Sequence, residues 1–119
     1  MLEIPIVERT PAHAEYVEGI ILGIESTAHT FSFGCVSTAG TLFPSMSSLF
    51  RPDEGGIHPR EAADHHSAST SILLEKLSST DEFDWGSVIA VAFSQGPGLG
   101  PCLRVGASVA RTLSSRLQV

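Results

Sequence analysis

Two hydroxyl side chains, Ser26 and Thr27, follow directly on an apolar stretch at residues 19–25. An uninterrupted apolar run of this length that ends in polar residues is typical of a strand covered on both faces. The turn after such a strand can direct backbone N–H groups and hydroxyls at a phosphate, because concave turns bind anions. Serine and threonine also occur in ordinary turns, where they bond their own backbone. Both interpretations stay open for this pair.

Three glycines, Gly96, Gly98 and Gly100, occupy alternate positions just before the last predicted helix. Glycine lets a ligand approach the backbone closely, and the N-terminus of a helix favours an anion. The stretch is not a Walker loop, since no Gly-Lys-Ser follows it, and it is not the dinucleotide-binding turn with its later acid. The alternative is that the glycines only permit tight packing of a strand against a helix.

A histidine-rich stretch, residues 55–67, invites a metal site. Neighbouring helical side chains such as His65 and His66 point about 100° apart, whereas ligands on one helix need a spacing of three or four. Glu61 and His65 have that spacing, but two ligands do not complete a site. We therefore predict histidines that are exposed or packed, and no metal ligand. No HExxH or GxSxG pattern is present, so protease chemistry has no support.

The elements that must position these residues follow from the periodicity of apolar side chains and from turn signals. The expected order is three strands, a helix, a strand and a helix, with the first three strands forming an antiparallel meander. Pro44 weakens the third strand, and Pro59 suits the first turn of the first helix. The predicted strands cover residues 19–25, 31–36, 41–50 and a fully buried 88–93; the helices cover 59–78 and a segment from Cys102 or Leu103 to the end.

Composition describes a globular chain of 119 residues with a net charge of −6, which argues against unaided capture of a polyanion. No apolar run approaches the roughly 20 residues that cross a bilayer, and no leader is evident, so we expect a cytoplasmic protein with no membrane contact. Residues 1–18 lack periodicity and are predicted to be a mobile extension. Cys35 and Cys102 are far apart and are expected to be small buried side chains.

Three motifs together carry a resemblance to a known family. They are LGIESTAHT at residues 22–30, GIHPREAADHH at 56–66 and AFSQGPGLGPCLRV at 92–105. In order and spacing they resemble the tRNA threonylcarbamoyladenosine synthase family, in its archaeal and eukaryotic branch. That branch is the catalytic subunit of the KEOPS complex, formerly called a glycoprotease or sialoglycoprotein endopeptidase. The resemblance extends from about residue 20 to residue 117.

The resemblance implies an α/β fold, the incomplete N-terminal lobe of an actin-like (ASKHA, ribonuclease-H-like) protein in the order βββαβα. Residues 19–119 would be part of the first lobe, with the second lobe absent. The family transfers a threonylcarbamoyl group from its adenylate to N6 of adenosine 37 in tRNA. Its divalent metal, of the iron or zinc type, is held by an HxxxH motif and a later acid that this chain lacks. No catalytic residue is therefore assigned, and the chain alone is expected to be inactive.

The resemblance also implies where ligands and partners meet the chain. Ser26, Thr27 and His29 would face the cleft between the lobes. Gly96, Gly98 and Gly100 would form the other edge of the site for threonylcarbamoyl-adenylate or an ATP-like nucleotide.

The expected partners are the tRNA substrate and KEOPS subunits, including a kinase-like subunit and a small dimerising one. The small subunit meets the helix from Pro59, where Ala62, Ala63 and His66 would be interface or core. The alternative is a non-catalytic remnant or docking module for such a partner; a sugar or acetate kinase lobe shares the architecture but not the motifs.

Overall fold

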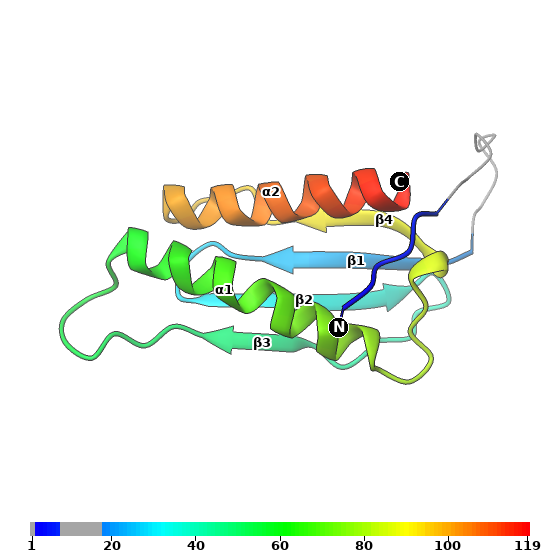
Figure 1. Cartoon of the computed structure of the whole chain (residues 1–119), viewed down its shortest axis with the longest axis horizontal. Coiled ribbons are helices and arrows are strands. Elements are labelled where there is room, and N and C mark those ends of the chain that lie inside the picture. Colours follow the sequence, from blue (N-terminus) through cyan, green and yellow to red (C-terminus); the bar gives the residue numbers. More distant parts are fainter. Residues whose placement is uncertain (1, 8–17) are drawn as a thin grey trace.

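The computed structural model describes residues 2–7 and 18–119 and shows a four-stranded sheet with two long helices (Figure 1). The sheet has the order β3-β2-β1-β4. Strand β1 pairs antiparallel with β2 and parallel with β4, and β2 pairs antiparallel with β3. The elements are β1 (Ile20–Glu25), β2 (Thr30–Ser37), β3 (Met46–Leu49), α1 (Pro59–Ser78), the short 3₁₀ helix η1 (Trp85–Ser87), β4 (Val88–Phe93) and α2 (Gly100–Leu117).

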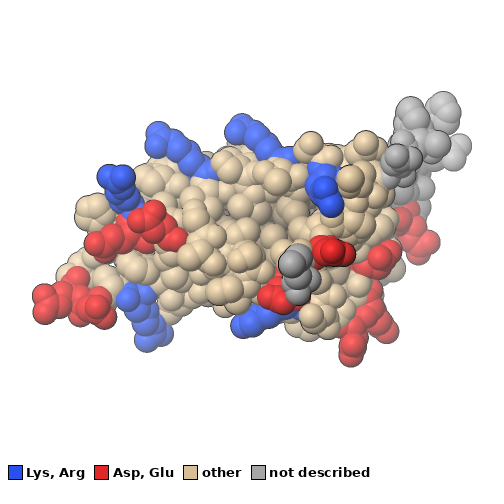
Figure 2. Space-filling model, in the orientation of Figure 1, with Lys and Arg blue, Asp and Glu red and all other residues tan. Residues whose placement is uncertain are grey.

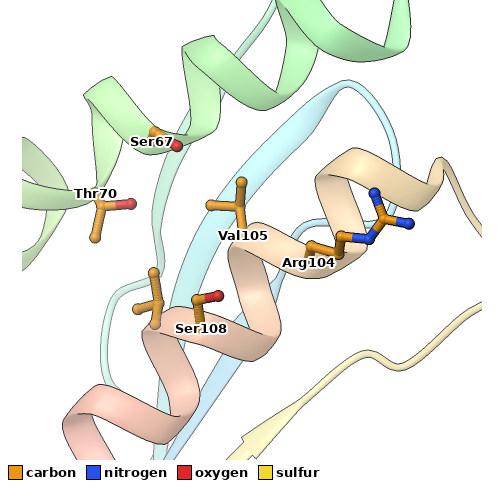
Figure 3. Close-up of a pocket in the computed structure, with 6 residues that line it drawn as sticks. Ser67, Thr70, Arg104, Val105 and Ser108 are labelled. Atoms are coloured by element: carbon orange, nitrogen blue, oxygen red, sulfur yellow. The ribbon is translucent and has the colours of Figure 1, made fainter.

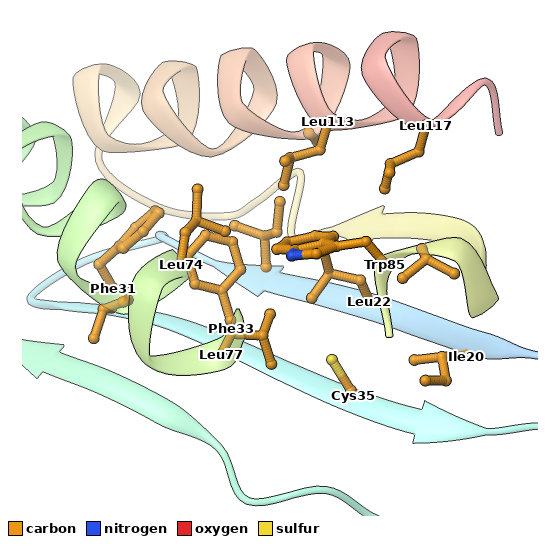
Figure 4. Packing of buried hydrophobic residues seen from close by; sticks show 14 residues of the cluster. Ile20, Leu22, Phe31, Phe33, Cys35, Leu74, Leu77, Trp85, Leu113 and Leu117 are labelled. Carbon is orange, nitrogen blue, oxygen red and sulfur yellow. The ribbon is translucent and has the colours of Figure 1, made fainter. Parts of the chain in front are cut away.

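The core lies between the sheet and the two helices (Figure 4). Side chains alternate along a strand, so every second residue of β1 and β2 faces α1 and α2, which together cover one face of the sheet. Phe31 and Phe33 are the largest of these buried side chains, and Trp85 belongs to the same cluster. Cys35 and Cys102 are both buried free thiols, as predicted.

The second face of the sheet differs from the prediction. Strand β1 alternates between buried and half-buried residues, and in β4 only Val88 is buried while Ala92 is exposed. The prediction that both strands are covered on both faces is therefore wrong for the described residues. The physical reason is that β4 is an edge strand and both helices lie on one side.

The bounds of β1 and β2 are within one residue of the prediction, whereas those of the third strand and the last helix differ more. The third strand is shorter than residues 41–50, because Pro44 has no N–H for the ladder; Leu42 makes only an isolated bridge with Val36. Helix α2 begins at Gly100, earlier than the predicted Cys102 or Leu103. Pro101 falls in its first turn, where a missing N–H costs no hydrogen bond.

Residues 2–7 lie against the C-terminal end of α2. The Arg116 side chain donates a hydrogen bond from Nε to the carbonyl oxygen of Ile4 at 2.8 Å, and Leu2, Ile4 and Val7 pack on the core. Residues 2–7 therefore pack against the fold, whereas the sequence predicted that they belong to a mobile extension. The rest of the predicted extension, residue 1 and residues 8–17, lies outside the described residues. Within residues 2–7 and 18–119, every helix is too short or too polar to span a bilayer.

Candidate functional site

The two predicted ligand-binding stretches meet at one edge of the sheet. Strands β1 and β4 run parallel, so their carboxyl ends lie side by side, and the loop after each begins there. The Ser94 N–H donates to the carbonyl oxygen of Ile24 at 3.0 Å, and the Leu99 N–H donates to that of Thr27 at 2.7 Å. The Leu99 bond therefore joins the glycine loop at residues 94–99 to the loop at residues 26–29, and the Ser94 bond ties the start of the glycine loop to β1.

Glu25 organises the junction of these loops. Its Oε1 accepts a hydrogen bond from the Thr27 N–H at 2.6 Å, and its Oε2 accepts one from the Ser94 hydroxyl, also at 2.6 Å. Burial raises the pKa of Glu25, but the hydrogen bonds from Ser94 and Thr27 outweigh it, so the net pKa is lower than usual. Neither Glu25 nor Ser94 was predicted as a site residue. Their separation of 69 residues hides the contact from local patterns.

Gly98 lies directly against Thr27. A β-carbon added at Gly98 would stand 2.4 Å from the Thr27 carbonyl oxygen, a distance that real β-carbons do not reach. Gly98 and Thr27 are therefore close enough to form one continuous surface, and Gly98 stays exposed on it. Gly96 and Gly100 are also exposed, and Gly100 begins α2 with open space around it.

Ser26 points away from this surface. It is buried, and its hydroxyl donates to the carbonyl oxygen of Cys102 in α2 at 2.9 Å. Gly106 provides the room, since a β-carbon there would lie 2.2 Å from the Ser26 Oγ. The structure thus places Ser26 in the contact between β1 and α2. His29 is exposed at the far end of the same loop, where its carbonyl accepts from the Phe50 N–H at 2.7 Å.

Positive charge is gathered on α2. The helix carries three exposed arginines, Arg104, Arg111 and Arg116, and no acidic residue. Figure 2 shows basic side chains along the edge of the molecule where α2 runs. The N-terminus of α2 is the positive end of the helix dipole and also favours an anion. Of the three arginines only Arg104 lies in the first turns of α2, so Arg104 and the helix N-terminus are the features that favour a negatively charged ligand beside the glycine loop, despite the net charge of −6.

His65 and His66, which were considered as metal ligands, pack against other side chains in the structure. His66 is buried and His65 is half-buried, and they bond each other. Within residues 2–7 and 18–119, no three His, Cys, Asp or Glu side chains come together as a metal site would require.

A groove of about 360 Å³ separates α1 from α2 on the outer side of the helix layer (Figure 3). Ser67 and Thr70 line it from α1, and Val105 and Ser108 from α2. Of the residues proposed as interface or core, Ala62 and His66 are fully buried, so they belong to the core. Ala63 is half-buried.

Comparison with known proteins gives a consistent result. The sequence model of the tRNA N6-adenosine threonylcarbamoyltransferase family matches residues 45–119. A protein of that name from Pyrobaculum calidifontis is 50% identical over 104 residues, which are 87% of this chain and 30% of the relative. One from Caldivirga maquilingensis is 52% identical over 95 residues, 80% of this chain and 29% of the relative. The chain thus spans about 30% of the length of these relatives.

A likeness in structure supports the fold. YeaZ from Pseudomonas aeruginosa superposes with a TM-score of 0.58 at 20% sequence identity, over 84% of this chain and 40% of that one. At this identity the likeness bears on the fold alone. It confirms the predicted fold class, an α/β lobe in the order βββαβα with a mixed sheet.

Proposed function

We propose that this chain, which belongs to the tRNA N6-adenosine threonylcarbamoyltransferase family, is the first-lobe part of such an enzyme. The complete protein would transfer a threonylcarbamoyl group from threonylcarbamoyl-adenylate to N6 of adenosine 37 in tRNA. The observation that carries the proposal is the meeting of the two family motifs at the Thr27–Leu99 hydrogen bond. Motifs that are about 70 residues apart build one exposed surface beside a helix N-terminus.

In this proposal the chain binds and orients the adenylate. The exposed Gly96, Gly98 and Gly100 let the phosphate approach the backbone at the positive end of α2. Thr27 and His29 line the surface from the loop after β1. Ser26 anchors that loop to α2 through its hydrogen bond to the carbonyl oxygen of Cys102. Glu25 and Ser94 fix the angle between the two loops. Each of these groups acts on orientation, and none is positioned here as an acid or base.

The chemistry itself is proposed to come from outside this chain. A divalent metal of the iron or zinc type, once bound, would polarise the reacting group. The described residues do not gather a set of ligands that fits such a metal, so no step is assigned to it here. The proposed partners are tRNA and KEOPS subunits, including a kinase-like one, in the cytoplasm. The α1–α2 groove, lined by hydroxyl and apolar side chains and by Arg104, is the proposed contact surface for a small dimerising subunit.

The experiment that tests the proposal is a chimera in which this chain replaces the matched segment of the Pyrobaculum calidifontis relative. We expect the chimera to modify tRNA with threonylcarbamoyl-adenylate, and the 119-residue chain alone to give no product. Turnover by the chain alone would refute the claim that the catalytic ligands lie elsewhere. A folded but inactive chimera, beside an active parent, would favour the alternative of a non-catalytic docking module.

A further inference from the structure

A chain of hydrogen bonds runs from β3 through α1 to the loop at residues 26–29. Its last member is His66, whose Nε2 lies 2.7 Å from the carbonyl oxygen of Ala28. A carbonyl oxygen can only accept, so Nε2 of His66 carries the hydrogen. Nδ1 of a neutral His66 must then be an acceptor, and its partner, Nδ1 of His65, lies 2.9 Å away. His65 therefore donates from Nδ1.

The β3 end of this hydrogen-bond chain determines the role of the remaining nitrogen, Nε2 of His65. Nε2 of His65 must accept, and the Ser48 hydroxyl donates to it at 2.9 Å. The Ser69 hydroxyl lies 3.2 Å from that of Ser48 and 3.3 Å from the same nitrogen. One arrangement of hydrogens thus satisfies every donor and acceptor, with His65 protonated on Nδ1 and His66 on Nε2.

Aromatic side chains pack against the imidazole rings of His65 and His66 and restrict their orientation. His66 stacks obliquely on Phe31 with 5.5 Å between ring centroids, and His65 on Phe50 at the same distance. Burial lowers the pKa of both histidines, and His65 and His29 lower that of His66 further, while the Ala28 hydrogen bond and Glu25 oppose this. Both rings therefore stay neutral near pH 7, as the tautomers require.

We propose that His66, oriented by His65, is a positioning residue that holds the carbonyl of Ala28 and thereby fixes the loop at residues 26–29. Thr27 and His29 flank Ala28 in that loop, and in the proposed function they line the surface that binds the adenylate. Only this last link rests on the proposed function. The hold on the loop stands on the contacts alone.

Two substitutions separate the two bonds that His66 makes. His66→Gln places an amide N–H2 near the position of Nε2, so it can still donate to Ala28, but it loses the contact at Nδ1. His66→Asn keeps a polar group near Nδ1, toward His65, and is too short to reach Ala28. Both variants lose the ring that stacks on Phe31, so they share the general packing defect.

The readout is amide hydrogen exchange in the 119-residue chain at about pH 7. The amides of Leu99 and Phe50 donate to the carbonyls of Thr27 and His29, so they report on the loop; that of Phe43 donates to Cys35 and reports on a remote strand. We expect His66→Asn to speed exchange at Leu99 and Phe50 by about tenfold over wild type, with Phe43 unchanged, as for loss of one buried hydrogen bond. His66→Gln should restore both to within about threefold of wild type.

A second readout needs no variant, so it holds even if one fails to fold. Nitrogen-15 spectra of the imidazole rings distinguish the tautomers directly, and we expect hydrogen on Nε2 of His66 and on Nδ1 of His65. The reverse assignment, or equal loop exchange in His66→Gln and His66→Asn, would overturn the positioning role. Neither readout requires nucleotide or tRNA, so failure of the proposed enzyme activity would leave both outcomes unchanged.

Discussion

Thr27 and Gly98 approach so closely that a β-carbon on Gly98 would lie 2.4 Å from the carbonyl oxygen of Thr27 and 2.9 Å from its β-carbon. The atom in the way is backbone oxygen, which cannot move aside as the tip of a side chain can. The same oxygen accepts the hydrogen bond from the Leu99 N–H at 2.7 Å. The contact therefore explains why glycine stands at this position whether or not a ligand binds there.

Gly98→Ala should separate the two loops. We expect a loss of about 1–3 kcal/mol in the free energy of unfolding, because the added methyl group overpacks a tight contact. Gly100→Ala is the matched control: apart from its chain neighbours and the backbone of its own helix, no atom lies within 4 Å of the added β-carbon, and alanine has a higher helix propensity than glycine. Urea unfolding of both variants and wild type provides the measurement. Equal stability of the two variants would contradict the close contact at Gly98.

A second tight contact joins Ser26 and Gly106. We expect Gly106→Ala to lower stability by about 2 kcal/mol, despite the gain in helix propensity, because the new methyl group meets the Ser26 hydroxyl. Ser26→Ala alone should cost about 1 kcal/mol for the lost hydrogen bond to Cys102.

The double variant tests whether these effects share one cause. Removing the hydroxyl creates room for the methyl group, so the double variant should be more stable than the sum of the single effects by about 1 kcal/mol or more. Simple additivity in urea unfolding would show that Gly106 does not pack on Ser26.

Burial should protect both thiols from reagents. It raises the pKa of Cys35 to about 11 and raises that of Cys102 as well, so almost no thiolate is present at neutral pH. We expect a disulfide reagent at about pH 8 to label the native chain at least about a hundred times more slowly than the chain unfolded in guanidinium chloride. Rapid labelling of one thiol in the native chain would show that its side chain is exposed.

Local sequence signals predicted the secondary-structure elements well, but they did not predict the contacts between those elements. Helix α1 was predicted with the bounds observed, because Pro59 supplies a start signal and the apolar residues keep a helical period. The Glu25–Ser94 and His66–Ala28 bonds join residues 69 and 38 positions apart, so no local pattern contains them. The role of Ser26 was hidden for the same reason, since its partner Cys102 belongs to the last helix. The ligand-binding roles of the six predicted site residues remain predictions.

Acid should destabilise the chain in two separate pH ranges. The pKa of His66 in the folded state is lower than its ordinary value of 6.5. Between these two pKa values the unfolded state binds a proton at this histidine and the folded state does not. Stability should therefore fall as the pH drops from about 6.5 through the folded pKa, with His65 contributing in the same range. Glu25 has a folded pKa below 4.5, so the stability that it contributes is present above 4.5 and lost as the pH falls through its folded value.

Two variants assign these ranges. His66→Gln should reduce the slope of stability against pH near and below 6.5, and Glu25→Gln should reduce it below 4.5. Urea unfolding at a series of pH values measures both. If His66→Gln left the upper slope at its wild-type value, the neutral, buried state of His66 would be contradicted.

Thr27 lies on the proposed ligand surface and Ser26 supports the loop that carries it, so both enter the last prediction, which uses the chimera with the Pyrobaculum calidifontis relative. Thr27→Ala and Ser26→Ala should each weaken binding of threonylcarbamoyl-adenylate, by about fivefold to tenfold for one lost or displaced polar contact. Their stabilities should differ, since Ser26 is buried against Cys102 and Thr27 lies at the surface of the loop. Thr27→Ser, which keeps the hydroxyl, is the control for Thr27. Calorimetric titration gives the affinities, and if Thr27→Ala bound the adenylate as tightly as wild type, the loop after β1 would have no direct part in the site.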